Sequence, residues 1–286
     1  MQVEAIPTTG PCTAGEIARD AVNRGADLIL AAGGDGTINE VVNGMVHSDV
    51  PLGILPAGTA NVLANELALG NTMERAAATL SHCVTERVAL GHLSLESPAT
   101  SRYFLLMAGA GLDAEIVFDL DLNLKSKLGK AAYWIGGFRK LGRRLREFTV
   151  EAEGREFRVS FALASRVRNY GGDLEIARSI SLLDDQFELV LFEGSSSVRF
   201  LKYLMGVAVR RHHQMSGITI LRTRRADFSI LNDRDIHLQV DGEYVGLAPG
   251  RVEIVPAALT LLTPPSLRTR RPASVEETAW TTLPTR

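Results

Sequence analysis

A short glycine-rich stretch with one acid, Gly33-Gly34-Asp35-Gly36-Thr37, has the composition most suggestive of chemistry in this sequence. Glycines at a turn let the backbone approach a ligand closely and adopt torsions that a Cβ would forbid. Free amides and the positive dipole end of a following helix would favour phosphate, with Thr37 as the expected cap. Asp35 would repel phosphates unless a cation or a substrate proton intervenes. For this turn taken alone, a plain strand-turn-helix corner is an equally good interpretation.

A second turn of the same kind is Gly58-Thr59-Ala60-Asn61. The two turns follow short apolar segments, 26–30 and 51–56, which we expect to be buried parallel strands. Each turn precedes a predicted helix, one over 39–46 and one from Asn61 to Leu69. Open α/β sheets bind ligands where such turns meet at the carboxyl edge of neighbouring strands, so the pair favours a phosphate site.

The other predicted elements divide the chain into two domains and a tail. Residues 3–6 are expected to form a strand and 13–23 a helix, which complete an α/β domain over 1–86. From Arg87 onward, alternating or β-branched segments predict a mostly antiparallel β-sandwich over 87–263, with helices at 124–145 and 198–210. Residues 264–286 are rich in Thr, Pro and Arg and are expected to be a flexible tail. The sandwich strands are predicted at 90–95, 103–108, 148–152, 156–164, 187–192, 218–221, 226–230, 236–240 and 251–255.

Composition narrows the classes of function. With 286 residues, 45% of them hydrophobic, the chain can bury a sizeable core. A formal net charge of −2 and the lack of a recognised nucleic-acid-binding motif argue against nucleic acid as a partner. Two distant cysteines, Cys12 and Cys83, suggest neither a disulfide framework nor a zinc site. No apolar segment is long enough to span a bilayer and no signal pattern is present, which predicts a cytoplasmic protein.

Six short motifs follow one another along the chain, at residues 33–40, 53–61, 108–114, 170–172, 183–185 and 240–243. In this order they resemble the diacylglycerol kinase catalytic-domain family, which includes bacterial lipid kinases and sphingosine and ceramide kinases. The resemblance covers residues 3–263. It implies an α/β nucleotide-binding domain and a mostly antiparallel β-sandwich domain, with ATP in the cleft between them. It also implies an opening βα unit with an Asn-Pro turn, which this chain lacks.

The resemblance implies roles for individual residues in nucleotide binding. Asn61 is expected to brace the second glycine turn, whereas Thr8, Asn39 and Glu40 could instead be ordinary turn and helix-start residues. The predicted ATP-binding residues are Thr8, Gly33, Gly34, Asp35, Gly36, Thr37, Ile38, Asn39, Glu40, Gly58, Thr59 and Asn61.

The catalytic pair implied by the resemblance is Glu243 and Asp35. Glu243 matches the general base that takes the proton from the lipid hydroxyl, although a solvated hairpin tip is the simpler interpretation of that residue alone. Phosphoryl transfer needs a divalent cation, and Asp35 is the candidate to hold Mg²⁺, through water. A second Mg²⁺ site is implied at Leu182, Asp185 and Phe187, where the leucine and phenylalanine could supply only backbone carbonyls. Gln186 stands where the family usually has a glycine, which argues against that site.

Two segments, 131–146 and 200–211, combine apolar and basic residues. Each could rest on an anionic membrane, or pack its apolar face on the sandwich and leave its charges solvated. We therefore predict a peripherally membrane-associated, ATP-dependent lipid kinase that phosphorylates the hydroxyl of a diacylglycerol, sphingoid or related lipid. The alternatives are an NAD kinase, which shares the Gly-Gly-Asp-Gly loop and the two-domain plan, and a lipid- or nucleotide-binding protein without catalysis. The sequence leaves a homodimer open.

Overall fold

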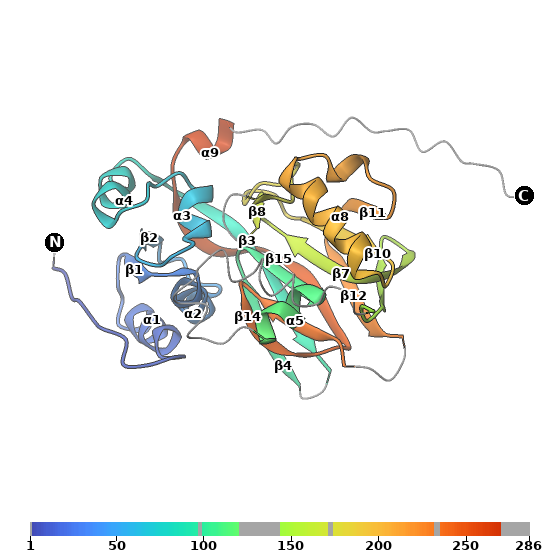
Figure 1. Ribbon diagram of the computed structural model, residues 1–286. Coiled ribbons are helices and arrows are strands. Elements are labelled where there is room, and N and C mark those ends of the chain that lie inside the picture. The colour runs from blue at the N-terminus through green and yellow to red at the C-terminus, as the bar shows by residue number, and fades with distance from the viewer. Residues whose placement is uncertain (1, 97–98, 120–143, 171–173, 232–234, 270–286) are drawn as a thin grey trace, which may run out of the picture.

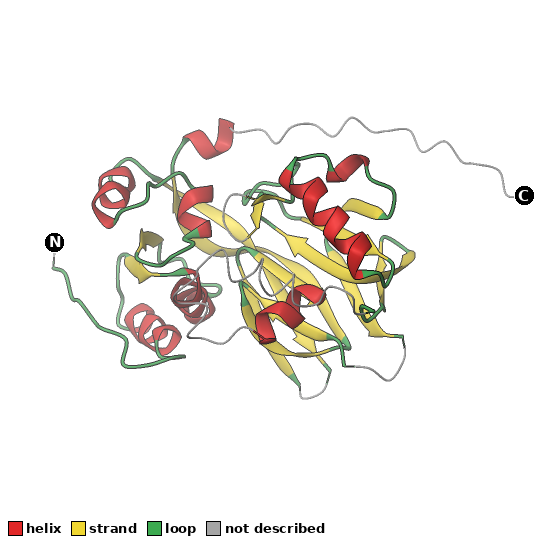
Figure 2. Cartoon of the chain, viewed as in Figure 1, coloured by secondary structure: helices red, strands yellow, loops and turns green. Residues whose placement is uncertain are grey.

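The computed structural model describes residues 2–96, 99–119, 144–170, 174–231 and 235–269. In these residues a thirteen-stranded sheet runs through the molecule, with helices packed against it at both ends (Figures 1 and 2). Part of this sheet is parallel and belongs to an α/β unit, and the rest is antiparallel. This confirms the predicted fold class, an α/β domain combined with a mostly antiparallel β-sandwich.

The α/β part carries both glycine turns at one edge of its sheet. Strands β1 and β2 pair in parallel, and Gly33 at the end of one lies opposite Pro56 at the end of the other. The two turns therefore leave the sheet side by side, as the sequence predicts. The elements are α1 (Ala14–Asn23), β1 (Ile29–Gly33), α2 (Asp35–Met45), β2 (Leu52–Pro56), α3 (Val62–Glu66) and α4 (Met73–Leu80).

Three local predictions in this part are wrong. Residues 3–6 form no strand, because no strand of the described chain lies alongside them to pair with their backbone. β1 begins at Ile29 and is an edge strand instead of a buried one, so Leu30 is 49% exposed. Helix α2 begins at Asp35, with Gly34 in extended conformation as its N-cap. Thr37 therefore lies inside the first turn, beneath Gly33, and does not cap the helix.

The antiparallel part follows the predicted strands closely. Its helix α8, predicted over 198–210, covers one face of the sheet (Figure 1). The elements are β3 (Val84–Leu95), β4 (Thr100–Phe104), β5 (Met107–Gly111), α5 (Leu112–Asp119), β6 (Phe148–Ala152), β7 (Arg155–Ser165), β8 (Asn169–Tyr170), β9 (Leu174–Glu175), β10 (Phe187–Glu193), α8 (Ser197–Ala208), η1 (His212–Gln214), β11 (Ile218–Thr223), β12 (Arg225–Ile230), β13 (His237–Val240), β14 (Glu243–Leu247), β15 (Gly250–Thr263) and α9 (Ser266–Thr269).

The alternation of side chains along β7 divides the core into two clusters. Phe161 and Leu163 point into a cluster that includes the inner face of α8, and Ala162 and Ala164 point into a second cluster inside the sandwich. This is the period-two pattern of a strand buried on both faces. It fixes the register of the central strands, because a slip of one residue would exchange the two faces.

Two long strands join the α/β part to the sandwich. β15 runs antiparallel to β3 over most of its length, and near its end Leu261 pairs in parallel with Leu52 of β2. The domain boundary predicted at Arg87 therefore falls inside β3. Shared strands of this kind hold the glycine turns at a fixed place relative to the sandwich.

Some predictions need correction or fall outside the described residues. The expected strand 103–108 is two strands, β4 and β5, and β14 and α5 were not predicted. The short α9 lies within the predicted flexible tail. Most of the predicted helix 124–145, most of the basic segment 131–146, the glycines of the 170–172 motif and residues 270–286 of the tail lie outside the described residues.

Candidate active site

The two glycine turns touch each other through their backbones. A Cβ on Gly58 would lie 2.5 Å from the Cα of Gly34, so only glycine allows this approach. Asn61 braces the second turn, as predicted: its Oδ1 accepts from the amide of Gly58 at 2.9 Å, and its Nδ2 donates to the Gly58 carbonyl at 2.8 Å. Gly58 and Thr59 are exposed. The backbone of this double turn is therefore accessible to a ligand.

Asp35 links the two turns. Its carboxylate accepts the backbone amides of Val62 and Leu63 at 3.1 and 3.3 Å, at the start of α3. Burial raises the pKa of Asp35, and these hydrogen bonds oppose the shift. The acid thus has a structural partner within the protein, which explains its presence in a turn suited to phosphate.

Five of the predicted ATP-binding side chains do not line the double turn, and one of these, Asn39, contacts the sandwich instead. Glu40 accepts the backbone amides of Cys12 and Ala14 at 2.9 and 3.0 Å and so caps α1. Ile38 is in the core, and Thr37 packs beneath Gly33. Thr8 is exposed in a segment without regular structure. The structure brings together Gly33, Gly34, Asp35, Gly36, Gly58, Thr59 and Asn61.

Glu243 reaches this place from the other end of the chain. It begins β14 after a turn at Asp241 and Gly242, both of which have positive φ. A Cβ on Gly36 would lie 2.7 Å from Oε1 of Glu243. Arg102 donates from Nη2 to Oε2 of Glu243 at 2.6 Å, and both side chains are partly buried. Glu243 is therefore an oriented carboxylate against the first turn of α2, and not a solvated hairpin tip.

A chain of hydrogen bonds fixes the Glu243–Arg102 pair. Arg102 also donates from Nε to Oδ1 of Asn39 at 2.9 Å, and Asn39, only 2% exposed, donates from Nδ2 to Oδ2 of Asp241 at 2.8 Å. Asp241 in turn accepts the amides of residues 105–107 at 3.2, 3.1 and 2.8 Å. We call Glu243, Arg102, Asn39 and Asp241 the site network. Asn39 is thus a link between α2 and the sandwich.

The environment of Asp241 disfavours its charge. Burial raises its pKa to about 6, against the opposing effect of the four hydrogen bonds that it accepts. The same hydrogen bonds explain why 103–108 is two strands, because the chain must turn at 105–106 to direct its amides at this carboxylate. Sequence reasoning missed Arg102 altogether. Asp241 stands within the motif 240–243, two residues before the predicted base, and that spacing was the available signal.

The residues of the second predicted Mg²⁺ site surround an arginine. Arg166 is fully buried, and its Nη2 donates to the carbonyl of Leu182 at 2.8 Å. Asp185 is exposed, and Phe187 is buried at the start of β10. Burial lowers the pKa of Arg166 to about 10, opposed by the charges of Asp185, Asp184 and Asp241, so the side chain remains a cation at neutral pH. A cation already occupies the carbonyl expected to bind Mg²⁺, so these residues do not fit the ion.

Metal-binding clusters elsewhere can be sought only among the described residues. Nowhere in the described parts of the chain do three or more His, Cys, Asp or Glu side chains gather in a way that could hold an ion. The predicted binding of Mg²⁺ therefore depends on Asp35 and on the phosphate groups of a bound nucleotide.

Comparison with known proteins gives consistent matches along the chain. Residues 1–93 match the model of the diacylglycerol kinase catalytic domain, and residues 107–263 match that of the YegS C-terminal NAD kinase beta sandwich-like domain. A diacylglycerol kinase of Bacillus subtilis (strain 168) is 32% identical over 249 residues, which are 85% of this chain and 80% of that protein. A diacylglycerol kinase of Staphylococcus aureus (strain NCTC 8325 / PS 47) is 30% identical over 81% of this chain and 73% of that protein.

A solved structure shows the same fold. The crystal structure of a diacylglycerol kinase from Bacillus anthracis str. Sterne superposes with a TM-score of 0.72 at 19% identity, covering 92% of this chain and 86% of that one. At this identity the comparison establishes the common architecture of the two chains.

Proposed function

This chain belongs to the diacylglycerol kinase catalytic-domain family, and we propose that it transfers the γ-phosphate of ATP to the hydroxyl of a diacylglycerol, sphingoid or related lipid. The observation that carries the proposal is the position of Glu243 against Gly36, at the first turn of the helix that follows the double turn. A general base and a phosphate-binding backbone are the two parts that phosphoryl transfer to an alcohol requires side by side.

The proposed reaction uses residues on both sides of this contact. Backbone amides of the double turn would hold the phosphates of ATP, helped by the dipole of α2. Glu243 takes the proton of the lipid hydroxyl as that oxygen forms a bond to the γ-phosphorus. The bond from phosphorus to the β–γ bridging oxygen breaks, and ADP leaves. Arg102 fixes one carboxylate oxygen, Oε2, and so keeps Oε1 directed at the turn.

A magnesium ion would reach this site with the nucleotide. Both oxygens of Asp35 already accept a backbone amide, but a carboxylate has about four lone-pair positions and can accept further hydrogen bonds. Asp35 therefore fits an ion that keeps its water shell, which Mg²⁺ usually does. Such an ion neutralises charge on the phosphate oxygens.

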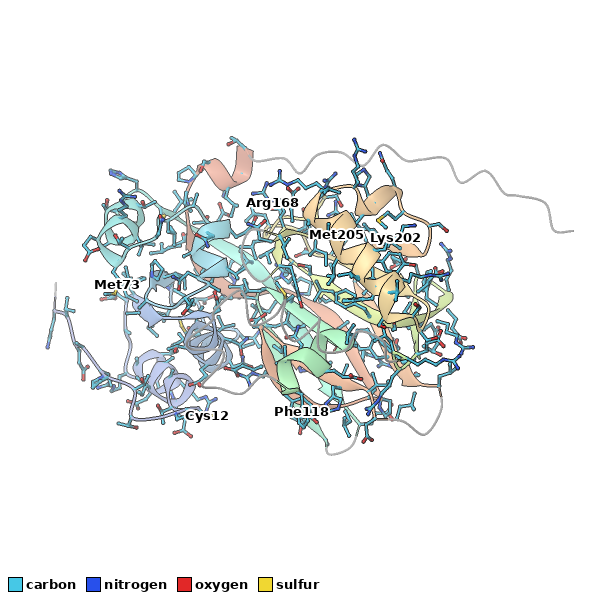
Figure 3. The ribbon with its side chains drawn as sticks, in the orientation of Figure 1. Cys12, Met73, Phe118, Arg168, Lys202 and Met205 are labelled. Atoms are coloured by element: carbon cyan, nitrogen blue, oxygen red, sulfur yellow. The ribbon has the colours of Figure 1, made fainter. Side chains whose placement is uncertain are left out.

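An aromatic cluster next to Glu243 supports an apolar acceptor. Phe118 of α5 contacts the rings of His237 and Tyr244, with centroids 4.5 and 4.9 Å apart. Phe118, labelled in Figure 3, is 53% exposed and lies near the end of α5, the helix that packs on β13 and β14. Tyr244 follows Glu243 in β14, so the cluster shares a strand with the proposed base, although successive side chains of a strand point to opposite faces. Exposed aromatic rings beside a polar site favour a ligand with an apolar body and a polar end.

The outer face of α8 supports a membrane as the place of reaction. Val198, Lys202, Met205 and Val209 are exposed and recur at helical spacing along one side, where Lys202 and Met205 are labelled in Figure 3. Three more basic residues flank them, Arg199, Arg210 and Arg211, and the segment 197–211 contains no acid. Each basic residue near an anionic surface contributes about 1 kcal/mol of attraction. The inner face of α8 packs on the sheet, as one interpretation of this segment expects, and we propose that the outer face rests on the membrane.

This surface would hold the protein at the bilayer, not in it. Among the helices of the described chain, none combines the length and the apolarity that crossing a membrane requires. Apolar side chains with basic neighbours are the composition of helices that lie in the interface.

Vesicle sedimentation tests the membrane surface. We expect the protein to bind vesicles of mixed anionic and zwitterionic lipid more strongly than purely zwitterionic ones, and Lys202→Glu to weaken that binding several-fold. Arg19→Glu makes the same change of net charge on exposed α1, far from α8 in Figure 1, and should leave binding unchanged. Equal loss in both variants would show that net charge alone attracts the vesicles, and no loss in either would refute the surface.

Transfer of labelled phosphate from ATP tests the reaction. The assay uses a panel of diacylglycerol, sphingoid and ceramide lipids in mixed micelles, with NAD as a further acceptor. Glu243→Gln keeps the shape of the side chain but removes the base, and should lower kcat by about 10²–10⁴-fold. Glu16→Gln, at an exposed position of α1, is the matched control.

Each alternative has its own result in this assay. Phosphorylation of NAD and of no lipid would identify an NAD kinase. Binding of ATP with no transfer to any acceptor would identify a binding protein. Full lipid kinase activity in Glu243→Gln would support the proposed reaction but refute the assignment of Glu243 as its base.

A further inference from the structure

Arg166 occupies a position inside the fold that arginines rarely take. It directly follows β7, and the residue is 0% exposed. Its backbone amide donates to the carbonyl of Leu106 at 2.8 Å, which fixes the start of the side chain. A buried guanidinium is costly unless oxygens and negative charges surround it. The contacts of this one are therefore informative.

Two carbonyls of the turn that precedes β10 face the guanidinium, and its buried Nε has no hydrogen-bond partner within the described residues. Nη2 donates to the carbonyl of Leu182 at 2.8 Å, and Nη1 approaches the carbonyl of Asp184 at 3.4 Å. The charges of Asp184, Asp185 and Asp241 stabilise the cation from a greater distance. Backbone carbonyls from one turn with nearby carboxylates are the environment that proteins provide for hard metal cations.

The turn is also closed without any ion. The amide of Asp184 donates to the carbonyl of Ser181 at 2.9 Å, and Oδ2 of Asp184 accepts from the amide of Ser181 at 3.1 Å and from Arg222 at 2.7 Å. Asp184 is therefore engaged, and Asp185 is exposed. The single cation in contact with the carbonyls of this turn, among the described residues, is Arg166.

We propose that the guanidinium of Arg166 is a built-in cation that replaces a metal ion in the turn 181–187. A divalent ion at the Leu182 carbonyl would lie next to a fixed positive charge, which would repel it. This part of the fold consequently requires no divalent cation, whatever the nucleotide brings to the double turn. The inference concerns folding and holds whether or not the proposed reaction is correct.

The arrangement also connects this turn to the site network. Through its amide, Arg166 holds Leu106, whose own amide donates to Asp241. Its guanidinium holds the turn that precedes β10. One residue therefore ties the turn 181–187 to the loop 105–107, a task that a bound ion would otherwise perform.

Thermal unfolding of the full chain, without nucleotide, in EDTA and in MgCl₂, tests the proposal. We expect Mg²⁺ to change the melting temperature of Asp185→Asn by the same amount as that of the wild type, because any Mg²⁺ that stabilises the wild type binds outside this turn. Arg166→Met removes the charge at similar size, and should lower the melting temperature by several degrees in EDTA and recover part of the loss in MgCl₂. In Arg166→Met with Asp185→Asn, that recovery should disappear. Arg222→Met removes the exposed arginine of β11 that pairs with Asp184 of this turn, and should not create a Mg²⁺ response.

Three results would overturn the proposal. One is that Mg²⁺ raises the melting temperature of the wild type but not that of Asp185→Asn, since the ion would then bind this turn beside Arg166. Another is an Arg166→Met protein as stable as the wild type and indifferent to Mg²⁺. If Arg166→Met does not fold, Arg166→Lys decides: it keeps the charge and should be stable in EDTA, and a requirement for Mg²⁺ would contradict the replacement.

Discussion

The raised pKa of Asp241 predicts an unusual dependence of stability on pH. A carboxyl group whose pKa is higher in the folded protein than in the unfolded chain binds more protons in the folded state between those two values. For Asp241 the values are about 6 and 3.8. The contribution of this group to the free energy of unfolding therefore decreases as pH rises from about 4 to about 6. Asp241→Asn removes the titration and keeps the shape of the side chain.

The structure gives a magnitude for this effect. A shift of about two pKa units corresponds to about 3 kcal/mol, at about 1.4 kcal/mol per unit. The side chain is partly exposed, so screening by water reduces the expected value to about 2 kcal/mol. Burial also raises the pKa of Asp35, and its contribution has the same sign. Asp35 is present in both proteins, however, so its contribution cancels in the difference between them.

Urea denaturation followed by far-UV circular dichroism, at pH 4 and pH 7, measures the difference. The quantity is the free energy of unfolding of the wild type minus that of Asp241→Asn, at each pH. We expect this difference to be about 2 kcal/mol larger at pH 4, even if the variant is less stable at both. Parallel pH profiles would refute the reasoning, because they would mean that Asp241 titrates alike in the folded and unfolded states.

Two further substitutions test the assignment of the double turn. Gly36→Ala places a Cβ 2.7 Å from Oε1 of Glu243, and should therefore abolish most lipid kinase activity. The melting temperature should stay close to that of the wild type, because alanine favours a helix by about 0.5–1 kcal/mol over glycine. A normal kcat in that variant would show that catalysis does not depend on the contact between Glu243 and the first turn of α2. Glu40→Ala removes the acceptor of two amides at the start of α1 and should lower the free energy of unfolding by about 1–2 kcal/mol, with unchanged affinity for ATP. Weaker ATP binding at unchanged stability would restore Glu40 as a nucleotide ligand.

Local sequence signals predicted the elements well but not their environments. The strand before Gly33 was recognisable from its apolar residues, yet its place at the sheet edge depends on which strands pair elsewhere. Likewise, the apolar and basic pattern of 200–211 predicted a helix, and only the fold shows which face of α8 is covered. Propensity and periodicity report on neighbours within a few residues, whereas burial is decided by the whole chain.

The contacts that orient the site were beyond local reasoning. Arg102 and Asn39 are 63 residues apart, and Asn39 and Asp241 are 202 apart, so no pattern within a window could join them. The local sequence gave no sign that Arg166 is buried, because a second arginine, Arg168, follows two residues later. The family resemblance supplied Glu243 without its partners. A family resemblance identifies which positions correspond between two chains. The hydrogen bonds that orient those residues are seen only in the structure of this chain.

One helix sets both halves of the proposed reaction. α2 begins at the glycine turn that would hold phosphate, and a single turn later it carries Asn39, through which Arg102 and Asp241 are fixed. The distance between the phosphate-binding backbone and Glu243 is therefore set by hydrogen bonds that join α2 of the α/β part to the sandwich. The sheet shared by β2, β15 and β3 acts in the same sense, because it leaves little freedom for the two parts to separate. In the proposed reaction, nucleotide and acceptor would accordingly enter a site whose catalytic geometry exists before either one binds, which is the condition for catalysis by positioning.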